Sequence, residues 1–205
     1  MSSLGRKRPL HQELNSDTST MSTIEDNDKV AHVNLVQRYS RQMLLPQVGP
    51  SGQLTLKNSS VLVIGTGGLG SAVIMYLAGA GLGRIDLIDF DVVDESNLHR
   101  QIIHSERNVG RSKVQSAYDR ICEINSSISC NILHTKLTFE NAKDILDKNY
   151  STIIDCTDNQ LSRYILNDCC YLLNIPLIHG SAIGMEGQLT LFSPRHGTSH
   201  AINIR

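Results

Sequence analysis

Several residue types that mark particular protein classes are scarce in this 205-residue chain. It has no tryptophan and only 4% aromatic residues, so it has few side chains on which the bases of a nucleic acid could stack. The 19 Lys and Arg nearly balance the 20 Asp and Glu, which argues against nucleic acid or an acidic membrane as a partner. No run reaches the roughly 18 apolar residues of a membrane span, and the N-terminus lacks the apolar core of a signal peptide. We therefore expect a soluble protein of the cytosol with neither partner.

Cysteine is also used in a way that excludes two kinds of scaffold. The five cysteines are odd in number and form no Cys-x-x-Cys, so neither a disulfide framework nor a local zinc knuckle is expected. We expect instead that the protein resides in a reducing compartment. Four of them fall on expected strand or helix positions, where we assign them to the core: Cys122, Cys130, Cys169 and Cys170. Cys156 stands in a motif discussed below and is also interpreted as structural.

The chain changes character twice along its length. Residues 1–30 are polar with almost no spaced apolar residues, and we expect a disordered tail. Residues 31–58 form an N-terminal helical segment, with a helix predicted over 33–44 and a Pro/Gly stretch after it. Residues 59–195 read as one nucleotide-binding domain, and 196–205 as a divergent tail.

Within residues 59–195, short apolar runs alternate with helical patterns. Strands are predicted at 61–64, 85–89, 128–132, 152–155 and 176–180, with a hairpin or edge strand at 188–192. A helix follows the first strand up to Gly81, and further helices are predicted at 113–124, around 142–146 and at 161–173. This alternation predicts an α/β, Rossmann-like, doubly wound and mostly parallel sheet with helices on both faces.

A glycine-rich turn follows the first predicted strand. Gly65, Gly67 and Gly70 fit G-x-G-x-x-G at the start of a helix, where a phosphate is favoured. The alternative is a tight strand–helix turn that needs glycine for packing alone. Asp89 ends the second strand, where an acid usually takes ribose hydroxyls, so the pair by itself suggests NAD and an oxidoreductase.

Other residues favour a nucleoside triphosphate over NAD. The extra glycine Gly68 brings backbone closer to the ligand, and two cations, Arg100 and Lys113, lie near the ends of the same strands. Fixed cations suit a reaction at phosphorus, because negative charge builds on the leaving pyrophosphate. Asp158 could hold Mg²⁺ and Asn159 could contact the nucleotide; alternatively, the two residues only cap the following helix.

Taken together, the motifs resemble one enzyme family over roughly residues 35–195. The segments, in order, are Arg38-Tyr39-Ser40-Arg41-Gln42, Gly65–Gly70, Asp89-Phe90-Asp91, Ser96–Gln101, Gly110-x-x-Lys113, Asp155–Asn159 and Gly184–Gln188. They resemble the adenylating enzymes of ubiquitin-like proteins, with the molybdopterin-synthase sulfur-carrier adenylyltransferases as the nearest likeness. The resemblance implies that the C-terminal glycine carboxylate of a carrier attacks the α-phosphate of ATP·Mg²⁺, in molybdenum-cofactor synthesis and transfer-RNA thiolation.

The same resemblance implies a role for particular residues. It places the nucleotide against Gly68, Asp89, Ser96, Asn97, Leu98, His99, Arg100, Lys113, Asp158 and Asn159. Arg100 and Lys113 would lie on the phosphates, and Asp158 would bind Mg²⁺. Arg41 resembles an arginine that reaches into the partner subunit's site, which implies a homodimer.

The resemblance stops before the end of the chain. Where the family continues into a Cys-x-x-Cys of a structural zinc site, this chain has His200 and Asn203, and Asn is not a usual zinc ligand. The zinc ligands, the thiol-bearing cysteine and the rhodanese domain of the eukaryotic form are absent, so we interpret the domain as C-terminally truncated. An alternative function is therefore a nucleotide-binding or dimerising module without full activity.

Overall fold

The computed structural model describes residues 36–193 and 198–204, which belong to two compact units, Met1–Gly49 and Pro50–Arg205. In the first unit, residues 36–43 are helical, and Arg41 is exposed on this helix. The predicted helix over 33–44 is thus present in its described part, and the predicted tail over 1–30 lies outside the described residues. No described helix is both long enough and apolar enough to cross a membrane.

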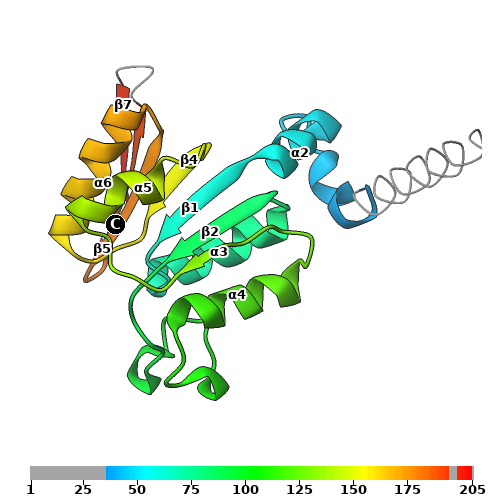
Figure 1. Cartoon of the computed structure of the whole chain (residues 1–205). Helices are drawn as coiled ribbons and strands as arrows, with labels where there is room; N and C mark the ends of the chain where they lie inside the picture. The colour runs from blue at the N-terminus through cyan, green and yellow to red at the C-terminus, as the bar shows by residue number, and fades with distance from the viewer. Residues whose placement is uncertain (1–35, 194–197, 205) are drawn as a thin grey trace, which may run out of the picture. The chain divides into compact units, whose positions relative to one another are not determined.

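Strands and helices alternate along the chain (Figure 1). The strands are β1 (Ser60–Ile64), β2 (Arg84–Ile88), β3 (Ile132–Leu133), β4 (Thr152–Asp155), β5 (Leu177–Ile183), β6 (Glu186–Ser193) and β7 (Thr198–Ile204). The helices are α2 (Gly49–Asn58), α3 (Gly68–Ala80), α4 (Lys113–Ile124), α5 (Phe139–Leu146) and α6 (Gln160–Leu173). Two short 3₁₀ turns, η1 (Glu95–Asn97) and η2 (Glu106–Asn108), lie between β2 and α4.

The strands form one sheet in the order β3-β2-β1-β4-β5-β6-β7. The first five strands in this order run parallel to one another, and β6 is antiparallel to both of its neighbours, β5 and β7. The chain moves outward from β1 in one direction through β2 and β3, then returns to the other side of β1 with β4. This confirms the predicted Rossmann-like class, and it puts the topological switch point between β1 and β4, where such sheets bind ligands.

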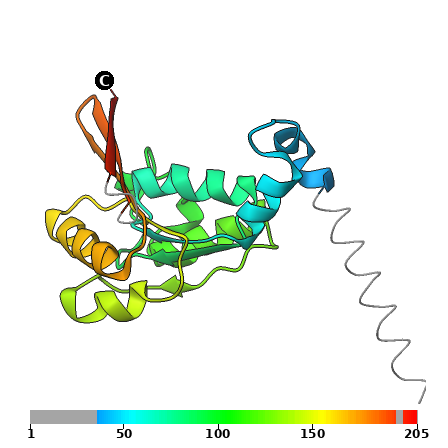
Figure 2. The same cartoon turned by 90° about the horizontal axis from the view of Figure 1, so that it is seen from above.

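Two apolar cores cover the two faces of the sheet, as the alternation of β1 requires. Leu62 and Ile64 belong to a core with residues of α5 and α6, whereas Val61 and Val63 belong to a core with residues of α3 and α4. Figure 2 shows α3 and the α5–α6 pair on opposite sides of the sheet. Both faces of β1 are therefore buried, which explains its unbroken apolar run.

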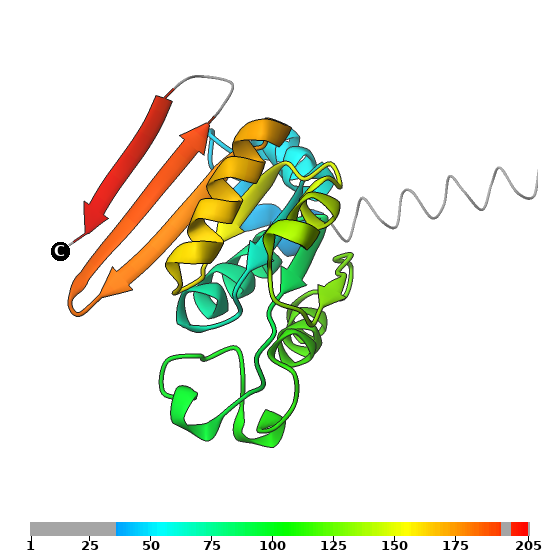
Figure 3. The same ribbon diagram turned by 60° about the vertical axis from the view of Figure 1, so that its left-hand side comes forward.

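The C-terminal strands differ from the helix-covered part of the sheet. β5 and β6 form a hairpin that turns at Gly184, whose φ is +59°, and at Met185, which is 94% exposed. The hairpin predicted at 188–192 is confirmed, but β6 is not an edge strand because β7 pairs with its other side (Figure 3). β7 lies in the segment 196–205, for which the sequence predicted no strand.

One predicted strand is much shorter than its pattern suggested. Residues 128–132 alternate in polarity, yet only Ile132–Leu133 pair as a strand with β2, and Ser129 makes an isolated bridge to Arg84. The backbone N–H of Asn131 donates to the Asp86 carboxylate, 3.0 Å away, instead of to a continuous ladder. A side-chain acceptor from the neighbouring strand thus replaces part of the expected pairing.

Candidate functional site

The carboxyl ends of three neighbouring strands are level with one another. In the register of the sheet, Ile64 at the end of β1 pairs with Ile88 of β2 and with Asp155 of β4. The N–H of Gly65 donates to Ile88 O at 2.9 Å, and the N–H of Cys156 donates to Ile64 O at 2.8 Å. The loops predicted to bind the nucleotide therefore begin side by side at the switch point.

The glycines of the turn after β1 have two different uses. A Cβ on Gly65, where φ is +91°, would lie 2.8 Å from Cys156 O, and a Cβ on Gly70 would lie 2.1 Å from Gly65 O. Packing therefore requires glycine at these two positions. At Gly67 and Gly68 the nearest atoms to such a Cβ are 3.7 and 3.8 Å away, so packing alone does not account for them. Their bare backbone is what close approach of a phosphate needs.

Helix α3 starts directly behind this turn without a side-chain cap. Its N-cap is Gly67, and its first turn carries no acidic residue. The first backbone N–H groups of a helix lack intrahelical acceptors and carry partial positive charge. The start of α3 is thus free to take a negatively charged group.

Thr66, at the base of the turn, is held at three atoms. Its N–H and its hydroxyl both donate to Asp89 Oδ2, at 2.8 and 2.9 Å, and its carbonyl accepts from His104 Nε2 at 3.0 Å. The other oxygen of Asp89 accepts the N–H of Asp91 at 2.9 Å. The residue predicted to bind ribose therefore also ties the loop after β2 to the turn after β1.

The tautomer of His104 follows from its two partners. A carbonyl can only accept, so Nε2 carries the proton and Nδ1 accepts from the Ser116 hydroxyl, 2.9 Å away. Burial is the largest cause that lowers the pKa of His104, and the Lys113 charge lowers it further, against the bond to Thr66 and the Asp89 charge. His104 is accordingly a neutral donor to the turn at physiological pH.

The two predicted cations lie in different surroundings. Arg100 is exposed, donates to Asn97 Oδ1 at 2.8 Å, and packs its Cγ near the space left open at Gly68. The side chain of Lys113, at the start of α4, is 7% exposed, and its Nζ lies 2.8 Å from Asp91 Oδ2. Arg100 is free to reorient toward a ligand, whereas Lys113 is held in place by Asp91.

The remaining predicted contacts around η1 form a short surface turn. Asp94 caps it by accepting the N–H of Ser96 at 2.8 Å. Ser96 and His99 are exposed, and Asn97 and Leu98 are half-buried. His99 Nε2 lies 3.4 Å from an Arg100 guanidinium nitrogen. The turn thus groups these residues beside Arg100.

The loop after β4 separates the two residues that the sequence paired. The Asn159 side chain accepts the Ser162 N–H at 2.8 Å and is the N-cap of α6, so the predicted cap is present at this residue. Asp158 is exposed. Behind them the buried Asp155 accepts from the N–H and hydroxyl of Thr157 and pairs with His179 Nδ1 at 2.7 Å.

Neither a preformed metal cluster nor a reactive thiol is found among the described residues at this site. In the part of the chain that the structure describes, no three His, Cys, Asp or Glu side chains gather closely enough to form a metal site. Burial raises the pKa of the Cys156 thiol to about 12, and the Asp155 charge adds to the rise. Cys156 is therefore protonated at neutral pH and unsuited to act as a nucleophile.

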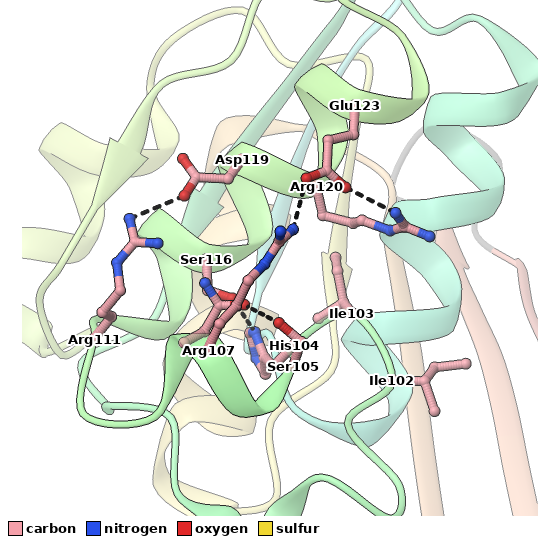
Figure 4. Close-up of a pocket in the computed structure, with 11 residues that line it drawn as sticks. Ile102, Ile103, His104, Ser105, Arg107, Arg111, Ser116, Asp119, Arg120 and Glu123 are labelled. Atoms are coloured by element: carbon pink, nitrogen blue, oxygen red, sulfur yellow. Dashed lines mark hydrogen bonds and ion pairs between the residues drawn. The ribbon is translucent and has the colours of Figure 1, made fainter.

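A polar cavity of about 640 Å³ is lined by residues that include His104 and Ser116 (Figure 4). Its arginines are already paired with carboxylates: Arg111 with Asp119, and both Arg107 and Arg120 with Glu123. This cavity is separate from the glycine turn, and its cations are largely neutralised.

Sequence reasoning missed several residues that shape the site. Thr66, Gln101, His104 and His179 were not singled out, because a polar residue between motif positions gives no sign of its partner. A weak signal existed only for Gln101, which ends the polar segment Ser96–Gln101, whereas His104 follows the two apolar residues Ile102 and Ile103. Arg41 lies in the other compact unit.

Known proteins are similar to this chain in sequence and in fold. Residues 39–203 match the ThiF family. The chain is 51% identical over 164 residues to the adenylyltransferase and sulfurtransferase MOCS3 of Culex quinquefasciatus, covering 80% of this chain but 37% of the relative. Escherichia coli MccB, solved with ATP, is 28% identical with a TM-score of 0.65, over 69% of this chain and 42% of that one. Escherichia coli TcdA, a tRNA N6-threonylcarbamoyladenosine dehydratase, is 30% identical with a TM-score of 0.68, over 73% and 64%.

Proposed function

Because this chain belongs to the ThiF family, we propose that it adenylates the C-terminal glycine carboxylate of a ubiquitin-like sulfur-carrier protein with ATP. The observation that carries the proposal is the open backbone at Gly67 and Gly68, which packing does not require, at the start of an uncapped helix. The relatives' name, adenylyltransferase and sulfurtransferase, and the ATP-bound neighbour support the same reaction class. The carboxylate oxygen attacks the α-phosphorus, and the bond to pyrophosphate breaks.

The reaction needs positioning and positive charge rather than a general base, since the nucleophile is already ionised. Gly68, Asp89 and the η1 turn seat the nucleotide, and Asn159, the N-cap of α6, contacts it as well. Lys113 offers a buried positive charge that Asp91 holds in position, and the exposed Arg100 swings onto the phosphates. Both cations then oppose the charge that develops on pyrophosphate.

Magnesium is the cation that this chemistry implies. Mg²⁺ is usually held by one or two carboxylates together with substrate phosphates and water, so a single exposed carboxylate fits it. Asp158 is that carboxylate. When bound, the ion would neutralise charge on the phosphates; the protein's own part is to present Asp158 in the loop after β4.

The deciding experiment is ATP–pyrophosphate exchange with the purified chain and a carrier that ends in Gly-Gly. We expect exchange only with the carrier, Mg²⁺-dependent and abolished in Asp158→Ala. Asp168→Ala removes an exposed carboxylate on α6, outside the loop that carries Asp158. It is the matched control and should keep full exchange. Full exchange in Asp158→Ala would refute the metal role.

Homodimerisation is a separate part of the proposal. Arg41, exposed on the helix of the first unit, acts in the partner subunit's site. Arg41→Ala and Asp158→Ala chains should each be inactive, and mixing them should restore exchange in about a quarter to a half of the sites. No recovery on mixing would refute the action in trans. The cytosol, molybdenum-cofactor synthesis and transfer-RNA thiolation are the proposed setting.

A nucleotide-binding or dimerising module is the second candidate. The chain spans 37% of the Culex relative's length and 64% of the length of TcdA. ATP binding without exchange would establish this function. Thermal protection by NADH in place of ATP·Mg²⁺ would refute both candidates and restore the oxidoreductase alternative.

A further inference from the structure

The side chain of Gln101 is buried with one end unpaired. Gln101 is 4% exposed and follows the η1 turn, where its N–H donates to Asn97 O at 2.9 Å. Its carboxamide oxygen, Oε1, is buried and has no hydrogen-bond partner among the described residues. A buried acceptor left unpaired costs about 1–3 kcal/mol, so a group that pairs with it only in a complex is expected.

The unpaired carboxamide lies beside the glycine turn. Gln101 Nε2 is the nearest atom, at 3.7 Å, to the place where a Cβ on Gly67 would stand. Arg100 covers the next glycine, Gly68, in the same way but from an exposed position. Two successive residues thus face two successive glycines, one as a mobile cation and one as a buried amide.

From this placement, we propose that Gln101 is a further nucleotide-contacting residue, whose Oε1 accepts a hydrogen bond from a ribose hydroxyl. The inference rests on the proposed function only in that a nucleotide binds at the glycine turn. Ionised phosphates offer no donor, and the ribose is the donor-bearing group attached directly to them. Asp89, the ribose ligand of the proposed site, bonds to Thr66, which precedes Gly67. Asp89 therefore lies against Thr66, and Gln101 lies against the next residue, Gly67.

Calorimetric titration with ATP, 2′-deoxy-ATP and 3′-deoxy-ATP tests the contact. Gln101→Met keeps the length and removes the acceptor, and we expect it to bind ATP about tenfold more weakly, the loss of one hydrogen bond. Against the analogue that lacks the contacted hydroxyl, the same variant should show no loss. Gln101→Glu keeps an acceptor oxygen and should bind ATP within a few fold of the unsubstituted chain.

Three results would overturn the contact. The first is an equal loss of affinity for ATP and for both deoxy analogues in Gln101→Met. The second is an unchanged affinity for ATP in Gln101→Met. The third is a loss of ATP binding in Gln101→Glu alone, with the variant still folded, because a new negative charge there would then lie next to a phosphate. Gln115→Met, at a half-buried glutamine on α4 that bonds Asp119, is the matched control and should leave every affinity unchanged. Thermal unfolding of each variant shows whether a weaker affinity comes from the missing hydrogen bond or from a variant that no longer folds.

The experiment also keeps the two proposals apart. If the unsubstituted chain binds no ATP, both are overturned. If it binds ATP without carrier-dependent exchange, the adenylation is overturned, and the comparison of ATP with its deoxy analogues still decides the Gln101 contact.

Discussion

Two loops at the carboxyl edge of the sheet use the same bond pattern over very different chain separations. Asp89, after β2, accepts the N–H and hydroxyl of Thr66 at 2.8 and 2.9 Å, and Asp155, at the end of β4, accepts those of Thr157 at 2.9 and 2.7 Å. Thr66 belongs to the loop of another strand, whereas Thr157 is two residues beyond Asp155. The first pair ties two loops together, and the second shapes one loop only.

The surroundings of the two threonines differ as well. Thr66 is fully buried, and His104 holds its carbonyl, so its polar atoms have no access to water if Asp89 is lost. Thr157 is half-buried, and water can replace its partner. The loop after β1, where we propose that the phosphates bind, is therefore held in place, and the loop after β4 is a local turn that presents the exposed Asp158 to solvent.

The largest expected effect comes from breaking the turn after β1 itself. Gly70→Ala places a Cβ 2.1 Å from Gly65 O, and backbone must move to relieve the clash. We expect a loss of about 3 kcal/mol or more in the free energy of unfolding, measured by urea denaturation, with loss of ATP binding. Gly79→Ala is the control on the same helix: nothing lies near its Cβ, and it should stabilise by about 0.5–1 kcal/mol. Equal stability of the two variants would contradict the close packing.

Removing the two carboxylates compares the loops directly. Asp89→Ala leaves buried donors of Thr66 unpaired and should lower the free energy of unfolding by about 2–3 kcal/mol. Asp155→Ala should lower it by about 1–2 kcal/mol, because Thr157 and His179 gain access to water. Amide hydrogen exchange should accelerate at Thr66 in the first variant and at Thr157 in the second. A larger loss in Asp155→Ala would reverse the comparison.

The contribution of His104 is visible in the pH dependence of stability. Its folded pKa lies below the ordinary 6.5, so as pH falls below about 6.5 the unfolded chain takes up a proton that the folded chain refuses. Stability should fall with decreasing pH, by at most about 1.4 kcal/mol per pH unit, until the folded pKa is reached. His104→Gln should flatten this part of the profile, and the exposed His99→Gln should leave it in place. An unchanged slope in His104→Gln would assign the effect to another group.

The smallest effect on stability is expected where the site is exposed. Arg100→Ala should change the free energy of unfolding by less than about 0.5 kcal/mol, because its partner Asn97 also reaches solvent. Exchange activity should nevertheless fall on the order of a hundredfold, as for other groups that meet transition-state charge. Urea denaturation and ATP–pyrophosphate exchange, measured on the same samples, separate the effect on stability from the effect on activity. Retained exchange would show that Arg100 is only a surface residue.

Strands and helices were predictable from the sequence where an element buries one face or is buried on both faces. The apolar run of β1, the amphipathic α4 and the helix stop at Gly81 carry their own signals, and each is confirmed. The strand at 128–132 was predicted too long because the Asp86 carboxylate, distant in sequence, takes the N–H of Asn131. Strand β7 was not predicted, since its pairing with β6 depends on a neighbour rather than on its own alternation.

For the site, the sequence alone determined the fold class and which loops begin at the switch point, because parallel strands bring their carboxyl ends to one edge. The tertiary structure alone decided how each polar group is used. Asp89 and Asn159 bond to backbone, Lys113 is held by Asp91, and Asp158 faces solvent. Hydrogen-bond partners distant in the chain are set by strand register and burial, and neither can be read from the spacing of residues along the sequence.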